Sequence, residues 1–140
     1  FVVILDKFTT YSLVQENLVV GAFVYYFIGL VISRFGSLVI EPFLKSVSFL
    51  KFVDYADFVS ASKVDQKVEA FSEVNNMYRT FTAMLVLLLF LKIYEFLEVR
   101  IPILSDHTPL VLVAVLLIMF LFSYRKQTGY ITKRIKAIKS

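Results

Sequence analysis

The chain has no cysteine and a single histidine, His107, among its 140 residues. Disulfide bonds, thiolate metal sites and cysteine nucleophiles are therefore excluded, as are zinc centres built from several imidazoles and histidine proton relays. The sequence also lacks a P-loop, a glycine-rich dinucleotide-binding turn, a GxSxG elbow and an HExxH motif. We therefore expect a protein that is not an enzyme and that uses no metal or other cofactor.

Acidic residues are missing from two informative places. No carboxylate lies at the centre of a long apolar stretch, where a proton-coupled transporter would normally keep one. The matching short or broken hydrophobic segments of secondary transporters are also missing. The last sixteen residues contain no acid, and their basic side chains are Arg125, Lys126, Lys133, Arg134, Lys136 and Lys139. Because the net charge of +4 comes from this tail, it gives no reason to expect direct binding of nucleic acid.

Hydrophobic residues make up 59% of the chain and are concentrated in three apolar stretches. These are Leu18–Ile40, Met77–Leu97 and Pro109–Tyr124, and the third gains length if its helix continues to Gln127. A helix rises about 1.5 Å per residue, so about 20 residues cross the roughly 30 Å hydrocarbon core of a bilayer. A soluble domain of this size has too little interior to bury three such helices. The sequence predicts an all-α, multi-pass membrane protein, with one transmembrane domain over residues 1–140 and spans at about 18–40, 77–97 and 109–127.

The distribution of lysine and arginine predicts the orientation, because cytoplasmic loops carry the excess of these residues. The stretch from the end of the first span to the start of the second contains Lys45, Lys51, Lys63 and Lys67, with Arg79 two residues inside the second span. The tail after the third span is also basic, whereas the connection between the last two spans has only Arg100 and the start of the chain only Lys7. We therefore place the connection 43–76 and the tail 128–140 in the cytoplasm, and the N-terminus outside.

An exterior N-terminus needs an explanation, because the chain starts at Phe1 with the sequence FVVILDK. A signal sequence cleaved before Phe1 is one explanation. The other, which we favour, is that Phe1–Leu5 is the end of an upstream helix. A fourth span would then precede the three described above.

Small residues recur along one face of the first apolar stretch. Ala22, Gly29 and Gly36 are spaced by seven, and Ser33 extends the row four residues after Gly29. In lipid, such rows let two helix backbones approach closely. The row fits packing inside one protomer or a contact between copies of the chain. Because three spans offer few internal partners, we expect a homo-oligomer.

Polar residues gather at the cytoplasmic ends of the first two spans. Pro42 is expected to end the first helix, with Arg34 and Glu41 on one face of its last turns. On the second helix, Asn75 falls on the apolar stripe and Arg79 lies one turn later. At a common depth these four side chains would form a polar cluster. It would either clamp the helices together or respond to a ligand or partner; alternatively, the charged groups reach individually to the interface.

Further helices are expected in the connection and the tail. Phe43–Val59 has the aromatic and charged composition of an interfacial segment, and Lys63–Leu97 is expected to be one helix projecting into the cytoplasm. The third helix is expected to begin with Thr108 as N-cap and Pro109 as its first residue. A bend at Gly129 would then lay a basic amphipathic helix on anionic lipid headgroups. Its headgroup-binding residues are Lys133, Arg134, Lys136 and Lys139.

Three blocks of sequence resemble small bacterial inner-membrane proteins, some of which are encoded in anti-phage defence islands. The blocks are SRFGSLVIEPFLK (Ser33–Lys45), YADFVSASKVDQKVEAFSEVNNMYRTF (Tyr55–Phe81) and SYRKQTGYITKRI (Ser123–Ile135). The resemblance implies a bacterial inner-membrane location with a cytoplasmic C-terminus. It also implies a role as a sensor or effector that works with a soluble cytoplasmic protein.

Three functions remain open on the sequence alone. The first is a homo-oligomeric membrane sensor or effector that responds to a cytoplasmic partner, with a change in membrane permeability as its output. The second is a passive anchor or assembly subunit that holds a cytoplasmic enzyme at the membrane. The third is a minimal ion channel.

Overall fold

The computed structural model describes residues 1–139, without the side chains of Pro102, Leu104, Ser105 and Lys139. Helices and short connections make up this part of the chain. In order they are α1 (Val2–Phe8), α2 (Leu18–Phe35), a π-helical turn (Gly36–Ile40), α3 (Glu41–Ser46), α4 (Tyr55–Val64), α5 (Lys67–Arg100) and α6 (Pro102–Lys139). The all-α class predicted from the sequence is confirmed.

Three of the helical segments are long and apolar enough to cross a membrane. They are Leu18–Ser46, Lys67–Arg100 and Asp106–Ile138. This confirms the predicted number of spans for these residues and indicates a multi-pass membrane protein. Only 11%, 11% and 6% of their most apolar windows are buried within the protomer. Most of the apolar surface of the spans therefore faces outward, as expected for helices surrounded by lipid.

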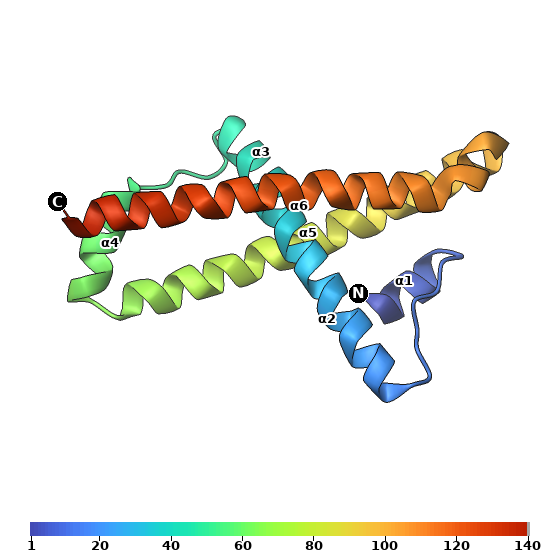
Figure 1. Ribbon diagram of the computed structural model, residues 1–140, viewed down its shortest axis with the longest axis horizontal. Coiled ribbons are helices and arrows are strands. Elements are labelled where there is room, and N and C mark those ends of the chain that lie inside the picture. Colours follow the sequence, from blue (N-terminus) through green and yellow to red (C-terminus); the bar gives the residue numbers. More distant parts are fainter. Residues whose placement is uncertain (140) are drawn as a thin grey trace.

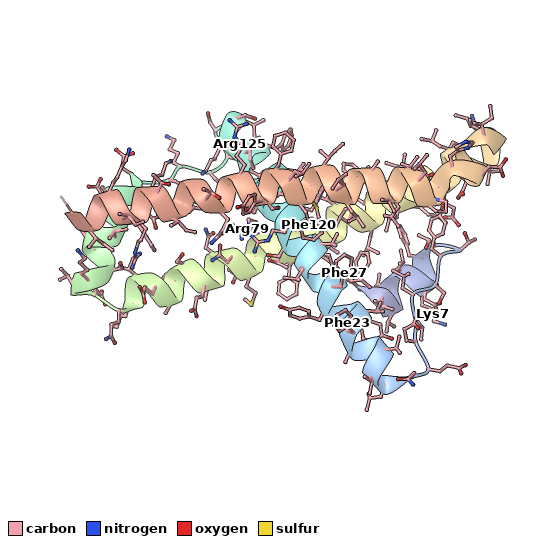
Figure 2. All side chains as sticks on the ribbon, viewed as in Figure 1. Lys7, Phe23, Phe27, Arg79, Phe120 and Arg125 are labelled. Carbon is pink, nitrogen blue, oxygen red and sulfur yellow. The ribbon has the colours of Figure 1, made fainter. Side chains whose placement is uncertain are left out.

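The two longest helices, α5 and α6, run antiparallel, and they diverge from the end where they are joined (Figure 1). α2 crosses them near their middle. α4 lies at one end of this pair, against the start of α5 and the end of α6. Where α2 crosses α6, the rings of Phe27 and Phe120 are 6.0 Å apart (Figure 2). At the far end of α6, Tyr55 of α4 and Tyr130 have ring centroids 6.1 Å apart.

A cluster of buried hydrophobic residues lies where the end of α2 and the π turn meet α5. Ile32, Ile40 and Ala83 form its buried core. A Cβ placed on Gly36 would lie 3.2 Å from Cβ of Ala83 and 3.3 Å from the carbonyl oxygen of Arg79. A methyl group at position 36 would therefore crowd these atoms, and glycine lets the two backbones approach without that crowding.

The first span does not end before Pro42, as the sequence predicted, because α2, the π turn and α3 follow one another without a break. That prediction is wrong. The N–H of Glu41 donates to the carbonyl of Gly36, five residues back, and Glu41 keeps helical angles of φ −62° and ψ −50°. This wider π turn places Pro42 in the first turn of α3, where a missing N–H is tolerated. The first span can therefore continue through α3 to Ser46.

The expected single helix Lys63–Leu97 is interrupted near its start. α4 ends at Val64, and Asp65 adopts extended angles of φ −131° and ψ 110°. The Asp65 carboxylate accepts a hydrogen bond from the backbone N–H of Lys67 at 2.9 Å. Because aspartate readily bonds to nearby backbone amides, it competes with the helix at this position. α5 then runs unbroken from Lys67 to Arg100.

The predicted start and bend of the third helix are also wrong. α6 already begins at Pro102 and contains Pro109, so Thr108 is not its N-cap. Thr108 instead donates its hydroxyl to Glu98 Oε1 at 2.9 Å, which joins α6 to α5. Gly129 lies within α6, because one glycine costs a helix only about 1 kcal/mol and intact turns flank it. The basic tail therefore continues α6 and does not form a separate amphipathic helix.

Candidate functional site

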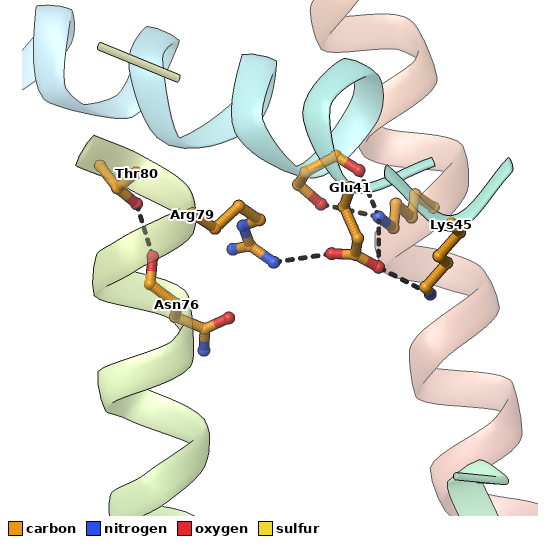
Figure 3. A network of polar contacts seen from close by, with 7 residues as sticks. Glu41, Lys45, Asn76, Arg79 and Thr80 are labelled. Carbon is orange, nitrogen blue, oxygen red and sulfur yellow. Dashed lines mark hydrogen bonds and ion pairs between the residues drawn. The ribbon is translucent and has the colours of Figure 1, made fainter. Parts of the chain in front are cut away.

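Glu41 is the centre of a polar network in which its side chain is only 9% exposed. Its Oε2 accepts a hydrogen bond from Nη1 of Arg79 at 2.8 Å, and its Oε1 accepts one from Nζ of Lys45 at 3.0 Å (Figure 3). Nζ of Lys126 lies 3.8 Å from Oε1. Burial of a carboxylate is costly unless cations and hydrogen bonds compensate it, and three cations do so here. We call Glu41, Lys45, Arg79, Lys126 and Ser37 the Glu41 cluster.

The cluster joins all three candidate spans. Glu41 and Lys45 are one turn apart on α3, at the end of the first span. Arg79 comes from α5 and Lys126 from α6. Each span therefore contributes charge to the same contact, which fixes the crossing of α2 over α5 and α6.

Ser37 connects the π turn to α6. Nζ of Lys126 donates to the backbone carbonyl of Ser37 at 2.5 Å and lies 2.8 Å from its hydroxyl oxygen. In the register of the π turn, the donor to this carbonyl would be residue 42. Pro42 has no N–H, so the carbonyl needs a donor from elsewhere. Lys126 supplies this donor.

A cavity of about 740 Å³ adjoins the cluster. It lies between the first span, the loop 47–54, α4, the start of α5 and the end of α6. Its charged lining residues are Arg34, Lys45, Arg79, Lys133, Glu41 and Asp54. Its aromatic lining residues are Phe49, Phe52, Tyr55, Phe58, Tyr78 and Tyr130. The lining of the cavity therefore combines charged and aromatic side chains.

The structure brings together part of the predicted polar cluster. Glu41 and Arg79 form a direct ion pair, whereas Arg34 and Asn75 line the adjoining cavity and make no direct contact with Glu41 in the described structure. Asn75 is exposed, although its place on the apolar stripe predicted a buried amide. The predicted buried amide at this position is therefore wrong.

The basic residues predicted to bind lipid headgroups have different surroundings. Lys133 lines the cavity, whereas Arg134 and Lys136 are exposed on the outer surface of α6. The side chain of Lys139 lies outside the described part of the chain. Of the predicted headgroup-binding residues that the structure describes, only Lys133 therefore lines the cavity.

The small residues of the first span also divide into two groups. Gly36 packs against α5, and Ser33 is half-buried beside a second, smaller cavity that Arg79 also lines. Gly29, by contrast, has no atom within 4 Å of the position of a Cβ, and Ala22 is exposed. Only the end of the row near Gly36 is used within the protomer. A contact between copies at Gly29 stays a prediction.

Sequence reasoning missed Lys45, Lys126 and Ser37. Glu41 and Lys45 have the i, i+4 spacing of a helical ion pair, but the expected stop at Pro42 concealed it. Lys126 follows the third apolar stretch and was counted with the basic tail. Its pairing depends on how α2 crosses α6, which no local pattern reports.

A second polar network lies at the opposite ends of α5 and α6. The hydroxyl of Tyr11 donates to Oε2 of Glu98, while Oε1 of Glu98 accepts from Thr108. The N–H of Thr10 donates to Glu95 at 2.9 Å. Burial and the Glu98 carboxylate raise the pKa of Tyr11 above its ordinary value. This network attaches the N-terminal segment to the α5–α6 hairpin.

The chain matches no known protein family, no curated protein and no solved structure. Among the described residues, no group of three or more histidine, aspartate or glutamate side chains is placed to hold a metal ion. The chemistry of this site is that of charge. Largely buried ion pairs join the helices, and they lie beside a cavity lined by several cations. This arrangement can clamp the spans, transmit a displacement between them or bind an anion.

Proposed function

We propose that this protein is a sensor or effector component of the bacterial inner membrane that works with a soluble cytoplasmic partner. The proposed partner surface is the part of the chain beyond the apolar stretches, residues 55–76 and 128–139, which we call the extension. The basic connection and tail favour a cytoplasmic position for it. The Glu41 cluster is the proposed junction between the extension and the spans.

Exposed apolar side chains on the extension carry this proposal. Val64 is 90% exposed and Phe71 is 71% exposed. Lys63 and Asp65 flank Val64, and Glu69 and Glu73 lie two residues to either side of Phe71. Both positions lie outside the long apolar stretches, so lipid does not account for their exposure. An exposed aromatic side chain in a charged setting is typical of a protein–protein contact.

The Glu41 cluster supplies a physical route from the partner to the membrane. Arg79 lies on α5, which continues without a break from the extension into the second span. A partner that displaced the start of α5 would also displace Arg79 relative to Glu41 and Lys126. The crossing of all three spans would then change, and a change in membrane permeability is the proposed output. The resemblance to proteins encoded in anti-phage islands suggests a defence role.

Site-specific photo-crosslinking in cells tests the partner surface. We expect a crosslinking amino acid at Phe71 to capture a soluble protein, and one at Val99, which is 82% exposed at the other end of α5, to capture none. With the crosslinking amino acid at Val64 instead, Phe71→Ser should abolish the crosslink. The same substitution should abolish the permeability response, measured as dye uptake when the captured protein is co-expressed. If Phe71→Ser abolishes binding but the parent protein shows no dye uptake with its partner, the protein is a passive anchor. Equal capture at positions 71 and 99 would refute a specific partner surface.

A further inference from the structure

The cavity beside the Glu41 cluster carries an excess of positive charge. Four cationic side chains line it, and Lys126 adds a fifth through its contact with Glu41. Only two carboxylates, Glu41 and Asp54, accompany them among the lining residues. Glu41 already accepts from Lys45 and Arg79. An anionic group would therefore be stabilised here, because uncompensated charge near the membrane is costly.

Two of the lining cations are free of the Glu41 network. The side chains of Arg34 and Lys133 make no hydrogen bond or ion pair with any residue that the structure describes, and both residues line the cavity. Arg79 uses Nη1 for Glu41, and its guanidinium has further N–H donors. Arginine donors suit the oxygen atoms of a phosphate group, because the planar guanidinium can donate two parallel hydrogen bonds. The cationic residues of the cavity lining therefore match a phosphate better than a cation or a neutral sugar.

The aromatic residues of the cavity lining indicate what the phosphate is attached to. Phe49, Tyr78 and Tyr130 provide apolar surface within the same 740 Å³ as the cations. Lys45 lies 4.1 Å from the ring centroid of Phe52, so charge and aromatic surface are in direct contact. The cavity also lies at the ends of the apolar stretches, where lipid headgroups are found. A ligand with a phosphate and an adjoining apolar part, present at the membrane interface, fits these features.

We propose that this cavity binds the phosphate headgroup of an anionic phospholipid, with Arg34, Arg79 and Lys133 as donors. The aromatic residues then contact the glycerol and the first acyl carbons. This inference does not depend on a protein partner, because the site is formed within one protomer.

Lipid retention and thermal stability test the site. The full chain is purified in an uncharged detergent and supplied with phosphatidylglycerol or phosphatidylcholine in mixed micelles. Phosphatidylcholine is the matched control, because it has the same phosphodiester but no net charge. We expect native mass spectrometry to show phosphatidylglycerol retained on the protein. The Tm of the protein should rise by about 3–6 °C under saturating phosphatidylglycerol. Equal retention and equal Tm shifts with the two lipids would overturn the proposal.

Matched substitutions separate this site from general attraction to a basic surface. Arg34→Gln and Lys133→Gln are expected to lower phosphatidylglycerol retention at least about fivefold each, as expected for loss of a charged hydrogen bond. Arg125→Gln and Lys136→Gln remove the same charges from exposed positions outside the cavity. They should change phosphatidylglycerol retention less than about twofold. All four variants should keep the lipid-free Tm, because none alters the Glu41 ion pairs. Equal losses in the two sets would show that the lipid binds only to surface charge and would refute the site.

Soluble phosphates test the source of the headgroup. Inorganic phosphate and glycerol phosphate lack acyl chains, so millimolar concentrations should neither displace phosphatidylglycerol nor raise the Tm. If either raises the Tm of the parent but not of Arg34→Gln, the cavity binds a soluble phosphate compound and the lipid assignment is wrong.

Discussion

Lys126 donates a hydrogen bond to the backbone carbonyl of Ser37, 89 residues earlier in the chain. The contact exists because Pro42 has no N–H to offer this carbonyl in the π turn. The same ammonium group lies 3.8 Å from the carboxylate of Glu41. One lysine therefore compensates both a backbone defect and a buried acid. The irregular turn and the ion pairs are parts of a single structure that holds three helices together.

Glu41→Gln is expected to destabilise the protein by about 2–4 kcal/mol, because Arg79 and Lys126 lose the carboxylate that compensates them. This destabilisation is smaller than that for a fully buried pair, because the side chains of Arg79 and Lys126 are 23% and 24% exposed. Thermal unfolding in detergent measures the change. Glu73→Gln is the control, since Glu73 is exposed and forms no ion pair in the described structure. Equal Tm values for the two variants would show that the Glu41 cluster does not stabilise the fold.

Gly36→Ala should lower the free energy of unfolding by about 1–3 kcal/mol, because the added methyl group overpacks the contact with Ala83. Gly129→Ala should have no cost, or stabilise α6 by up to about 1 kcal/mol, because no atom lies within 4 Å of its Cβ position. Unfolding curves of the two variants in the same detergent provide the comparison. A Gly36→Ala protein as stable as the parent would show that α2 and α5 can separate at low cost.

Gly29→Leu tests the predicted contact between copies of the chain. Within the protomer the position is open, so the substitution should leave the fold and the Tm of the protomer unchanged. In a homo-oligomer assembled through this face, the larger side chain should separate the helices and reduce the assembled mass. Multi-angle light scattering in detergent measures that mass, with Val24→Leu as the control. An unchanged mass for Gly29→Leu would place any contact between copies elsewhere.

Reporter fusions test the orientation on which the cytoplasmic extension depends. A fusion in the break between α4 and α5, at Gln66, should be active only as a cytoplasmic reporter. A fusion at Ile101, between α5 and α6, should be active only as an exterior reporter. The opposite result at both positions would place the extension outside the cell and refute a cytoplasmic partner.

Sequence patterns predicted the helices better than their ends. The length and composition of the apolar stretches were sufficient to predict the spans. Their ends placed Glu41 and Arg79 in one expected cluster, but the direct ion pair between them came only from the structure. The stop at Pro42 was wrong because a π turn, which no residue pattern marks, placed the proline in the first turn of α3. The helix start at Pro109 was wrong because Thr108 bonds to Glu98 instead of capping its own helix. In each case a contact or a turn geometry overrode a local preference.

The sequence by itself determined the class of the protein, because the number and length of apolar helices depend on composition along the chain. It also determined which charged residues lie near the ends of the spans. Only the tertiary structure decided that Lys45, Arg79 and Lys126 share one carboxylate, and that Gly36 meets Ala83 while Gly29 remains open. The reason is physical: the angle and position at which α2 crosses α5 and α6 are set by contacts between distant residues. Those contacts select which faces of three similar apolar helices meet, and helical periodicity alone leaves that choice open.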